Sequence, residues 1–470
     1  MEPIGTASNP LRVAVVGAGP AAFYAAEHLM KQPDLVAEVD MFDKLPTPFG
    51  LVRGGVAPDH QKIKSVTKVY DKVAARPGFR FFGNVAFGRD VSLDDLRRHY
   101  HQVFFATGAQ TDRSLGVPGE ELQGSHSATE FVAWYNGHPE YRHLTFDLSQ
   151  ERVAVVGVGN VAVDVCRILC RTPEELAQTD IADYALEALR HSRVKEVYML
   201  GRRGPAQAAF SNPEIKELGE MEDADVFTLP EEVALDALSR AELERNPDRT
   251  VSKNVELMQA LAQAQPSGKS KRLVIRFLVS PVEISGDADG RVAGVRIVRN
   301  ELYDAGDGRL RPRATDCFED LPVGLVFRSV GYLGVPLPGV PFDEKKGTIL
   351  NDTGRVLDPA TRQPLTGVYA GGWIKRGPSG VIGTNKACSV ETVGCMLEDL
   401  ARGAVLAPAA PSAEAAEQLV RSRQPHVFTF EDWQRIDALE TERGTAAGRP
   451  RVKFTCVEDM LEALGRTVPS

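Results

Sequence analysis

Two glycine-rich segments of the same kind could each hold a pair of phosphate groups. They read GAGPAA over residues 17–22 and GVGNVA over residues 157–162, and each follows a run of β-branched and small apolar residues. Between a strand and a helix, such a segment binds a dinucleotide pyrophosphate, because glycines let the backbone approach and the helix N-terminus offers free N–H groups. We therefore expect two dinucleotide sites and electron transfer between two cofactors. The residues that fit the motif are Gly17, Gly19, Ala22, Gly157 and Gly159.

The first glycine segment lies in a predicted βαβ unit, with strands over residues 11–16 and 37–43 and a helix over residues 21–31. The second of these strands ends on Asp43, 24 residues after Gly19. An acidic side chain near this spacing accepts hydrogen bonds from ribose hydroxyls and repels a 2′-phosphate. Asp43 therefore favours FAD or NAD at the first site. The alternative is an ordinary surface aspartate at a strand end.

The second unit carries the opposite charge at the corresponding place. It begins with a strand over residues 152–156, contains an added helix over residues 180–191, and continues with a strand over residues 194–200. That strand ends in Gly201-Arg202-Arg203-Gly204. Two guanidinium groups can clamp a 2′-phosphate through charge-assisted hydrogen bonds, so the second site favours NADP(H). The alternative is a solvated arginine pair in a turn.

Other strand ends could also approach a ligand. Strands over residues 102–106 and 367–370 run into Thr107-Gly108 and into the glycine-rich residues 371–383, and a helix is expected from near Gly380 to near Leu400. Taken alone, Thr107-Gly108 favours a tight turn. Residues 45–60 are too rich in Pro and Gly for regular structure. A helix over residues 235–245 and strands over residues 273–278, 292–298 and 324–330 carry no chemistry that we can assign.

Bulk composition sets outer limits on the function. A chain of 470 residues is expected to form two or three domains. Its 25% charged residues, net charge of −9 and lack of a long apolar run argue against membrane insertion and nucleic-acid binding. The start resembles neither a secretory signal nor a transit peptide, which favours the cytoplasm. Six scattered cysteines are interpreted as buried thiols without a metal site, and residues 404–413 as a linker before a polar C-terminal tail.

Three longer motifs resemble those of the adrenodoxin reductase family of ferredoxin–NADP⁺ reductases, including its bacterial members. They are the loop PFGLVR over residues 48–53 with VAPDH over 56–60, the turn GRRGP over 201–205, and GWIKRGP over 372–378. The resemblance covers most of the chain. It implies an α/β fold with two Rossmann-like dinucleotide-binding domains, similar to glutathione reductase, in which the NADP domain is inserted into the FAD domain. The implied segments are 1–112 and 335–470 for the FAD domain and 113–334 for the NADP domain.

The resemblance also implies roles for individual residues. FAD contacts are expected at Ala18, Asp43, Leu51, Val85, Trp373, Gly380, Val381 and Ile382. NADP contacts are expected at Arg113, Gly159, Asn160, Val161, Arg202, Arg203 and Glu214. The polar pair beside the flavin would be His60 with Glu217 or Glu214, because Ser211-Asn212-Pro213 leaves the local alignment open. His60 would relay a proton or orient a neighbour, and its alternative is a histidine satisfied within its own loop.

The expected reaction follows from these cofactors. NADPH would reduce FAD, and a small acidic ferredoxin-type iron–sulfur protein would collect the electrons one at a time in a transient complex with a monomeric enzyme. Arg53, Lys375 and Arg376 could help to attract that partner, or could be solvated or contact phosphate. Alternatives are a thioredoxin reductase-like disulfide reductase, the NADPH-oxidising subunit of a glutamate-synthase-like complex, and a non-catalytic NADP-sensing module. The absence of a C-x-x-C pair and of an N-terminal cysteine cluster disfavours the first two.

Overall fold

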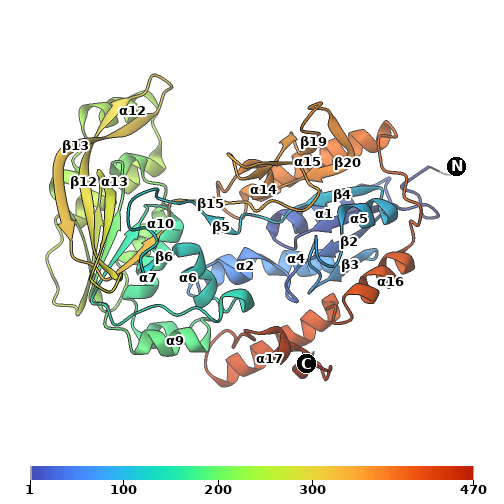
Figure 1. The fold of residues 1–470 in the computed structure, drawn as a ribbon, viewed down its shortest axis with the longest axis horizontal. Coiled ribbons are helices and arrows are strands. Elements are labelled where there is room, and N and C mark those ends of the chain that lie inside the picture. The colour runs from blue at the N-terminus through green and yellow to red at the C-terminus, as the bar shows by residue number, and fades with distance from the viewer. Residues whose placement is uncertain (1–2, 469–470) are drawn as a thin grey trace. The chain divides into compact units, whose positions relative to one another are not determined.

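The computed structural model describes residues 3–468, and the chain divides into two compact units. The first unit contains the chain up to Val56, His60–Thr111 and the chain from Tyr332 onward. The second contains Ala57–Asp59 and Asp112–Gly331. In Figure 1 the first unit holds the blue and the orange-to-red segments, and the second holds the green and yellow ones. Each unit is built around its own sheet.

The first unit is built on a seven-stranded sheet in the order β18-β19-β20-β4-β1-β2-β3. The strands β1, β2, β3, β4 and β20 are parallel, whereas β18 and β19 are antiparallel. Residues of β1 alternate between two apolar cores, one on each face of the sheet. A parallel sheet covered on both faces needs apolar side chains on both, which explains the unbroken apolar run of β1. The strands are β1 (Leu11–Val16), β2 (Ala37–Phe42), β3 (Phe79–Phe82), β4 (Gln102–Phe105), β18 (Asn351–Asp352), β19 (Arg355–Leu357) and β20 (Pro364–Ala370).

The C-terminal part of the chain completes this first unit. Strand β20 pairs directly with β4, and helix α15 (Thr384–Ala401) packs on α1 (Pro20–Met30). Helices α16 (Ala413–Arg423), α17 (Phe430–Ala446) and α18 (Val457–Ala463) follow. Trp433, Phe454 and Met460 are buried in the core of the unit. The expectation of a polar C-terminal tail is therefore wrong: the apolar residues are spaced among charged ones, so that one face of each helix is buried.

The second unit is built on a six-stranded sheet in the order β6-β14-β7-β8-β10-β9, in which all pairs are parallel. Its strands are β6 (Ser125–Ser127), β7 (Arg152–Val156), β8 (Glu196–Leu200), β9 (Ala224–Thr228), β10 (Lys271–Arg276) and β14 (Leu325–Arg328). A three-stranded antiparallel sheet joins it, formed by β11 (Val279–Gly286), β12 (Val292–Asp304) and β13 (Leu310–Leu321). Helix α7 (Asn160–Cys170) follows β7 and is buried along almost its whole length. The predicted α/β class with two Rossmann-like domains, one inserted into the other, is confirmed.

The remaining elements are short or peripheral. The helices of the first unit are α2 (Leu51–Gly54), α3 (Gln61–Lys64), α4 (Thr67–Ala74), α5 (Leu93–His99) and α14 (Trp373–Arg376). Those of the second unit are α6 (Ala128–Tyr135), η1 (Pro139–Tyr141), α8 (Pro173–Ala177), α9 (Asp183–Arg190), η2 (Pro205–Gln207), α10 (Asn212–Leu218), α11 (Pro230–Val233), α12 (Ala237–Arg245) and α13 (Arg249–Leu261). The short strands are β5 (Thr111–Asp112), β15 (Tyr332–Leu333), β16 (Phe342–Asp343) and β17 (Thr348–Ile349).

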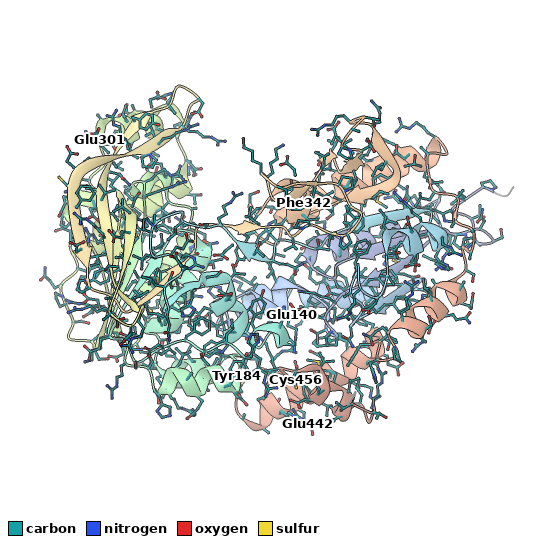
Figure 2. All side chains as sticks on the ribbon, in the orientation of Figure 1. Glu140, Tyr184, Glu301, Phe342, Glu442 and Cys456 are labelled. Carbon is teal, nitrogen blue, oxygen red and sulfur yellow. The ribbon has the colours of Figure 1, made fainter. Side chains whose placement is uncertain are left out.

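Several sequence-based expectations need local correction. Residues 51–54 form a helical turn within the loop that was expected to be irregular. Helix α15 starts at Thr384 rather than near Gly380, because Gly380 has a φ of +77° that a right-handed helix cannot contain. Cys317 is exposed and Cys456, labelled in Figure 2, is half-buried, so the interpretation of all six thiols as buried is wrong for these two. Among residues 3–468, we find no helix with the length and apolar character to cross a bilayer.

Candidate functional site

The first glycine turn leaves room for a ligand at the N-terminus of α1. Gly17 has a φ of +101°, and a Cβ there would lie 2.4 Å from the carbonyl oxygen of Ala106. Gly19 is the N-cap of α1 without any side-chain cap, and a Cβ on it would meet nothing within 4 Å. Ala18 and Ala22 are fully buried against the strands. The helix therefore presents backbone donors to open space, which fits a pyrophosphate.

Asp43 is tied to this turn at the end of β2. Its Oδ2 accepts a hydrogen bond from the N–H of Ala18 (2.8 Å), and its Oδ1 accepts one from the N–H of Leu45 (2.9 Å). The N–H of Val85, whose side chain is buried, bonds to the carbonyl oxygen of Asp43 (2.8 Å). The carboxylate is thus fixed beside the glycine turn, where it fits a ribose with free hydroxyls.

The loop after Asp43 folds back on the same turn. The N–H of Phe49 donates to the carbonyl oxygen of Ala18 (2.8 Å), and Phe49 itself has a φ of +83°. Leu51 begins α2 and exposes 36% of its surface, which is unusual for leucine beside a buried core. Arg53 is largely buried and paired with Glu440. The suggestion that Arg53 attracts an acidic partner is therefore wrong, because its charge is already used inside the unit.

Trp373 and the segment after it form a second loop of the first unit. Gly372 has a φ of +71°, and a Cβ there would lie 2.6 Å from the Cβ of Ala21. The indole N–H of Trp373 donates to the carbonyl oxygen of Ser379 (3.1 Å), and its ring lies 5.6 Å from that of Tyr332. These contacts hold an aromatic side chain beside Gly380, Val381 and Ile382, of which Val381 is 58% exposed. An exposed valine beside an indole fits the flat face of a ligand ring.

Two basic side chains of this loop are held inside the first unit. Lys375 is only 7% exposed and pairs with Glu391, while the Arg376 guanidinium bonds to Thr384 Oγ1 (3.2 Å) and Asn385 Oδ1 (3.1 Å). A partner-attracting role is therefore wrong for Lys375. Arg376 holds the first residues of α15 in place.

His60, the residue predicted to relay a proton, also belongs to the first unit. It is 8% exposed and directly precedes α3.

The second glycine turn repeats the geometry of the first. Gly157 has a φ of +139°, and a Cβ there would lie 2.2 Å from the carbonyl oxygen of Ser329. Gly159 is the N-cap of α7 without a side-chain cap, and a Cβ on it would again meet nothing within 4 Å. Asn160 accepts a hydrogen bond from the N–H of Ser211 through its Oδ1 (2.9 Å), and Val161 packs partly on the core. This helix N-terminus is also open to an anion.

The arginine pair lies just after β8, where the backbone is held by neighbouring strands. Asn300 Nδ2 donates to the carbonyl oxygen of Arg202 (2.9 Å). The N–H of Leu278 donates to the carbonyl oxygen of Arg203 (3.1 Å). Burial, and then the charge of Arg202, lower the pKa of Arg203. Within residues 3–468 neither the Arg202 nor the Arg203 guanidinium lies within 4.0 Å of a carboxylate oxygen. Two like charges held together with no carboxylate in ion-pair contact fit a doubly charged phosphate, although Glu242 lies near enough to oppose the lowering of the Arg203 pKa. Arg113, after β5, is exposed.

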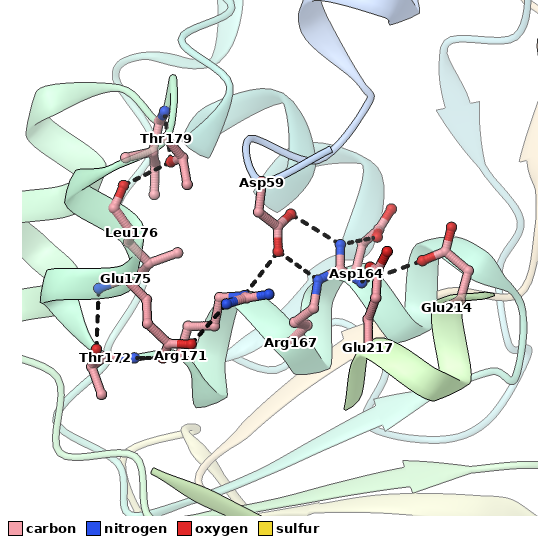
Figure 3. A network of polar contacts seen from close by, with 11 residues as sticks. Asp59, Asp164, Arg167, Arg171, Thr172, Glu175, Leu176, Thr179, Glu214 and Glu217 are labelled. Atoms are coloured by element: carbon pink, nitrogen blue, oxygen red, sulfur yellow. Dashed lines mark hydrogen bonds and ion pairs between the residues drawn. The ribbon is translucent and has the colours of Figure 1, made fainter. Parts of the chain in front are cut away.

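Glu214, expected to contact NADP, and Glu217, expected with His60 beside the flavin, belong to a network on the second unit (Figure 3). Glu214 of α10 is buried, and its Oε2 lies 3.3 Å from Nη1 of Arg167 on α7. Glu217, one turn later, is 36% exposed, and its Oε2 lies 3.9 Å from the same nitrogen. Asp59 accepts two hydrogen bonds from Arg167, of 2.6 and 3.0 Å. The structure therefore brings Glu214 and Glu217 together around one buried arginine.

Sequence reasoning did not single out Arg167. Its partner Asp59 lies 108 residues earlier in the chain, which no local pattern reveals. A signal was present in α7, where Asn160, Asp164, Arg167 and Arg171 are spaced so that they share one face of the helix. This spacing on a helix that follows a glycine turn indicates a polar network along one face of α7.

The comparisons with known proteins agree with this geometry. Residues 11–204 match the family described as pyridine nucleotide-disulphide oxidoreductase. The chain is 44% identical over 461 residues to the NADPH-ferredoxin reductase FprA of Mycobacterium tuberculosis, a match that covers 96% of this chain and 99% of the relative. It is 41% identical to the mitochondrial NADPH:adrenodoxin oxidoreductase of Arabidopsis thaliana, covering 97% of this chain and 96% of the relative.

A solved structure of a relative extends the likeness to three dimensions. The structure of Mycobacterium tuberculosis FprA in complex with NADPH superimposes with a TM-score of 0.91 at 44% identity, and the match covers 97% of this chain and all of that one. The two chains therefore share the whole fold.

Proposed function

The chain belongs to the adrenodoxin reductase-type family of NADPH-ferredoxin reductases, and from this premise we propose that it carries electrons from NADPH through FAD to a ferredoxin-type iron–sulfur protein. It is an NADPH-dependent flavoprotein oxidoreductase. The first unit would hold FAD and the second NADP(H). The observation that carries this assignment is the charge that follows each glycine turn: Asp43 in the first unit, and Arg202 with Arg203 in the second.

The residues of the first unit fit FAD. The open N-terminus of α1 would bind the pyrophosphate, and Asp43 would accept hydrogen bonds from the ribose. Leu51, Trp373 and Val381 are exposed or partly exposed apolar groups suited to a flavin ring. Ala18, Val85, Gly380 and Ile382 complete the proposed set. The segments 1–112 and 335–470 would form this FAD domain.

The residues of the second unit fit NADP(H). The open N-terminus of α7 would bind the pyrophosphate at Gly159, Asn160 and Val161. Arg202 and Arg203 would clamp the 2′-phosphate, and Arg113 and Glu214 would contact the rest of the nucleotide. The segment 113–334 would form this NADP domain. When both cofactors are bound, a hydride can pass from nicotinamide to flavin, and the flavin can release electrons one at a time.

His60 and Glu217 are proposed as the polar pair beside the flavin. Each nitrogen of an imidazole can donate or accept a hydrogen bond, so His60 can relay a proton or orient a neighbouring group. The reaction transfers a hydride and then electrons, so it needs no side-chain nucleophile. His60 would therefore raise the rate without being indispensable.

The partner is proposed to be a small acidic ferredoxin that binds transiently to a monomeric enzyme in the cytoplasm. Arg53 and Lys375 do not supply the surface patch for this partner, because both side chains are largely covered and held in ion pairs. The basic residues that bind the ferredoxin would therefore be other lysines and arginines that the structure exposes. Binding through such groups weakens as the salt concentration rises.

The experiment is an anaerobic assay in which a purified [2Fe–2S] or [4Fe–4S] ferredoxin is the electron acceptor. NADPH and catalytic amounts of the FAD-loaded protein should bleach the iron–sulfur absorbance completely, and more slowly at high salt. A protein whose flavin is reduced by NADPH but which transfers nothing to ferredoxin, or to an artificial one-electron acceptor such as ferricyanide, would instead be an NADP-sensing module. Transfer to ferricyanide but to no ferredoxin would contradict the proposed partner.

A further inference from the structure

Helices α3 and α4 of the first unit carry a run of positive charge (Figure 1, blue). Residues 61–76 contain five basic residues and one acidic residue, in a chain whose net charge is −9. Lys62, Lys68 and Lys72 are exposed, and within residues 3–468 none of their ammonium groups lies within 4.0 Å of a carboxylate oxygen. We call these three lysines, together with the exposed Ile63 and Val69, the α3–α4 surface.

The spacing of the lysines on α4 does not stabilise the helix. Lys68 and Lys72 lie one turn apart, and like charges at that spacing destabilise a helix. The other face of α4 is covered, because Tyr70 and Val73 are buried in the core of the unit. The lysines therefore face solvent on a helix that is held in place by its apolar side.

The acidic groups on and beside α4 have other neighbours. Asp71, the one acidic residue of the segment, interacts with Asp437 and Arg451 of the same unit, and burial followed by the charge of Asp437 raises its pKa. Glu27 belongs to α1, on which α4 packs, and forms an ion pair with Lys31. These carboxyl groups therefore do not cover the α3–α4 surface.

Two apolar side chains accompany the lysines. Ile63 exposes 43% of its surface and Val69 exposes 40%. Exposed apolar groups with charged groups around them are typical of surfaces that contact another protein. The lysines would attract an acidic protein from a distance, and the apolar groups would contact it once it is bound.

The α3–α4 surface also lies close to the proposed flavin site. Helix α3 contacts α2, and α2 begins with the exposed Leu51. Leu51 is one of the residues proposed to touch the flavin. The rate of electron transfer falls steeply as the distance between donor and acceptor grows, so a partner bound beside α2 would be well placed to receive an electron.

We propose that the α3–α4 surface is the docking site for the acidic ferredoxin. The inference rests on the proposed function, which supplies the partner and its charge. The other exposed helices at the C-terminal end of the first unit fit this partner less well. Helix α16 carries two acidic and two basic residues, and α17 carries five acidic and two basic ones. A balanced or acidic surface does not attract an acidic protein.

The test is charge reversal in the FAD-loaded full-length protein, with a purified acidic ferredoxin as the acceptor. In Lys62→Glu/Lys68→Glu/Lys72→Glu, the KM for ferredoxin should rise by about tenfold or more at about 20 mM salt. The difference from the wild type should shrink to about twofold or less at about 500 mM salt, because salt screens exposed charges. The rate at which NADPH reduces the bound FAD in anaerobic stopped flow should not change, because that step needs no acceptor protein.

The matched control reverses three exposed cations that lie on different elements of the same unit. This variant is Arg98→Glu/Lys345→Glu/Arg435→Glu, which has the same net charge as the test variant. Its KM for ferredoxin should rise by about threefold or less at low salt. Val69→Ser keeps every charge, and calorimetry should show that it weakens ferredoxin binding by about twofold or more at both salt concentrations.

The outcomes separate the docking site from the proposed function. An equal rise in KM for both triple variants would overturn the proposed docking site, because net charge alone would explain it, and so would an unchanged KM in the test variant. If NADPH does not reduce the wild-type flavin, the proposed function is wrong, and calorimetric binding of ferredoxin to the wild type and to both triple variants still decides the docking site. Calorimetry that detects no binding of ferredoxin to the wild type would contradict both the partner and the surface.

Discussion

The guanidinium of Arg53 is held by Glu440, a residue 387 positions later in the chain, through hydrogen bonds of 2.8 and 2.5 Å. Glu440 is fully buried and also accepts hydrogen bonds from Arg451 (3.0 Å) and from the N–H of Phe454 (2.8 Å). The Arg53 guanidinium lies 5.0 Å from the centre of the Trp433 ring. The loop that carries Leu51 is therefore fixed by the C-terminal helix α17 of the same unit.

Replacing Glu440 by Gln should loosen this loop. The change leaves two guanidinium groups beside a neutral side chain, and breaking a buried pair of this kind costs about 3 kcal/mol of unfolding free energy. Chemical denaturation at pH 7 measures the loss. FAD retention on a desalting column should fall with it. Glu442→Gln, at an exposed position on the same helix (Figure 2), should change neither quantity.

The effect of Glu440→Gln should also depend on pH. Although burial opposes ionisation, Arg53 and Arg451 hold the pKa of Glu440 below its ordinary value. The stabilisation from the ionised carboxylate is thus present above the ordinary glutamate pKa of about 4.3 and is lost as the pH falls through the lower, folded-state pKa. The stability difference between wild type and variant should shrink below about pH 4. A difference that stays constant with pH would contradict the ionised state of Glu440.

The double variant Arg202→Ala/Arg203→Ala should lose the preference for the phosphorylated nucleotide. Each charge-assisted hydrogen bond to phosphate is worth about 1.5–3 kcal/mol, so NADP⁺ affinity should fall by about a hundredfold or more. NAD⁺ affinity should change much less. Calorimetric titrations with both nucleotides measure this, and Arg193→Ala, at an exposed position before β8, is the control. Equal losses for both nucleotides would show that the pair does not recognise the 2′-phosphate.

His126 should make the second unit sensitive to acid. It lies in β6 with its ring edge-on to Phe146 at 4.8 Å, and burial followed by the Arg328 charge lowers its pKa to about 4. The unfolded chain binds a proton there below about pH 6.5, so folded-state stability is lost between about pH 6.5 and 4. Thermal unfolding of His126→Gln should therefore vary less over this range than that of the wild type. His143→Gln, at an exposed position of the same unit, should keep the wild-type dependence.

Replacing His60 by Ala should slow flavin reduction by NADPH without abolishing it. A positioned proton-transfer group contributes about 10²-fold or more, whereas hydride transfer itself depends on how the two cofactors are positioned. Stopped-flow reduction of a folded, FAD-loaded variant measures the rate. Complete loss of reduction would show that His60 is indispensable, and an unchanged rate would remove it from the mechanism.

The sequence predicts those parts of the site that are local in the chain. A glycine turn and the charged residue at the end of the next strand lie within one βαβ unit. The pairing of Gly17 with Asp43, and of Gly159 with Arg203, could therefore be predicted from the sequence alone. Pairs such as Arg53 with Glu440 and Arg167 with Asp59 could not, because they depend on how distant segments pack. The same holds for β20, which enters the first sheet beside β4. Helix α2 and the late start of α15 depend on the φ angles of single residues such as Gly50 and Gly380.

The most direct test of the central claim is the visible spectrum of the purified protein during matched anaerobic titrations with NADPH and NADH. The proposed function predicts bound flavin whose absorbance is bleached by about one equivalent of NADPH and far less readily by NADH, because only the former carries the 2′-phosphate. The absence of bound flavin would contradict the FAD site, and equal bleaching by both nucleotides would contradict the role of Arg202 and Arg203.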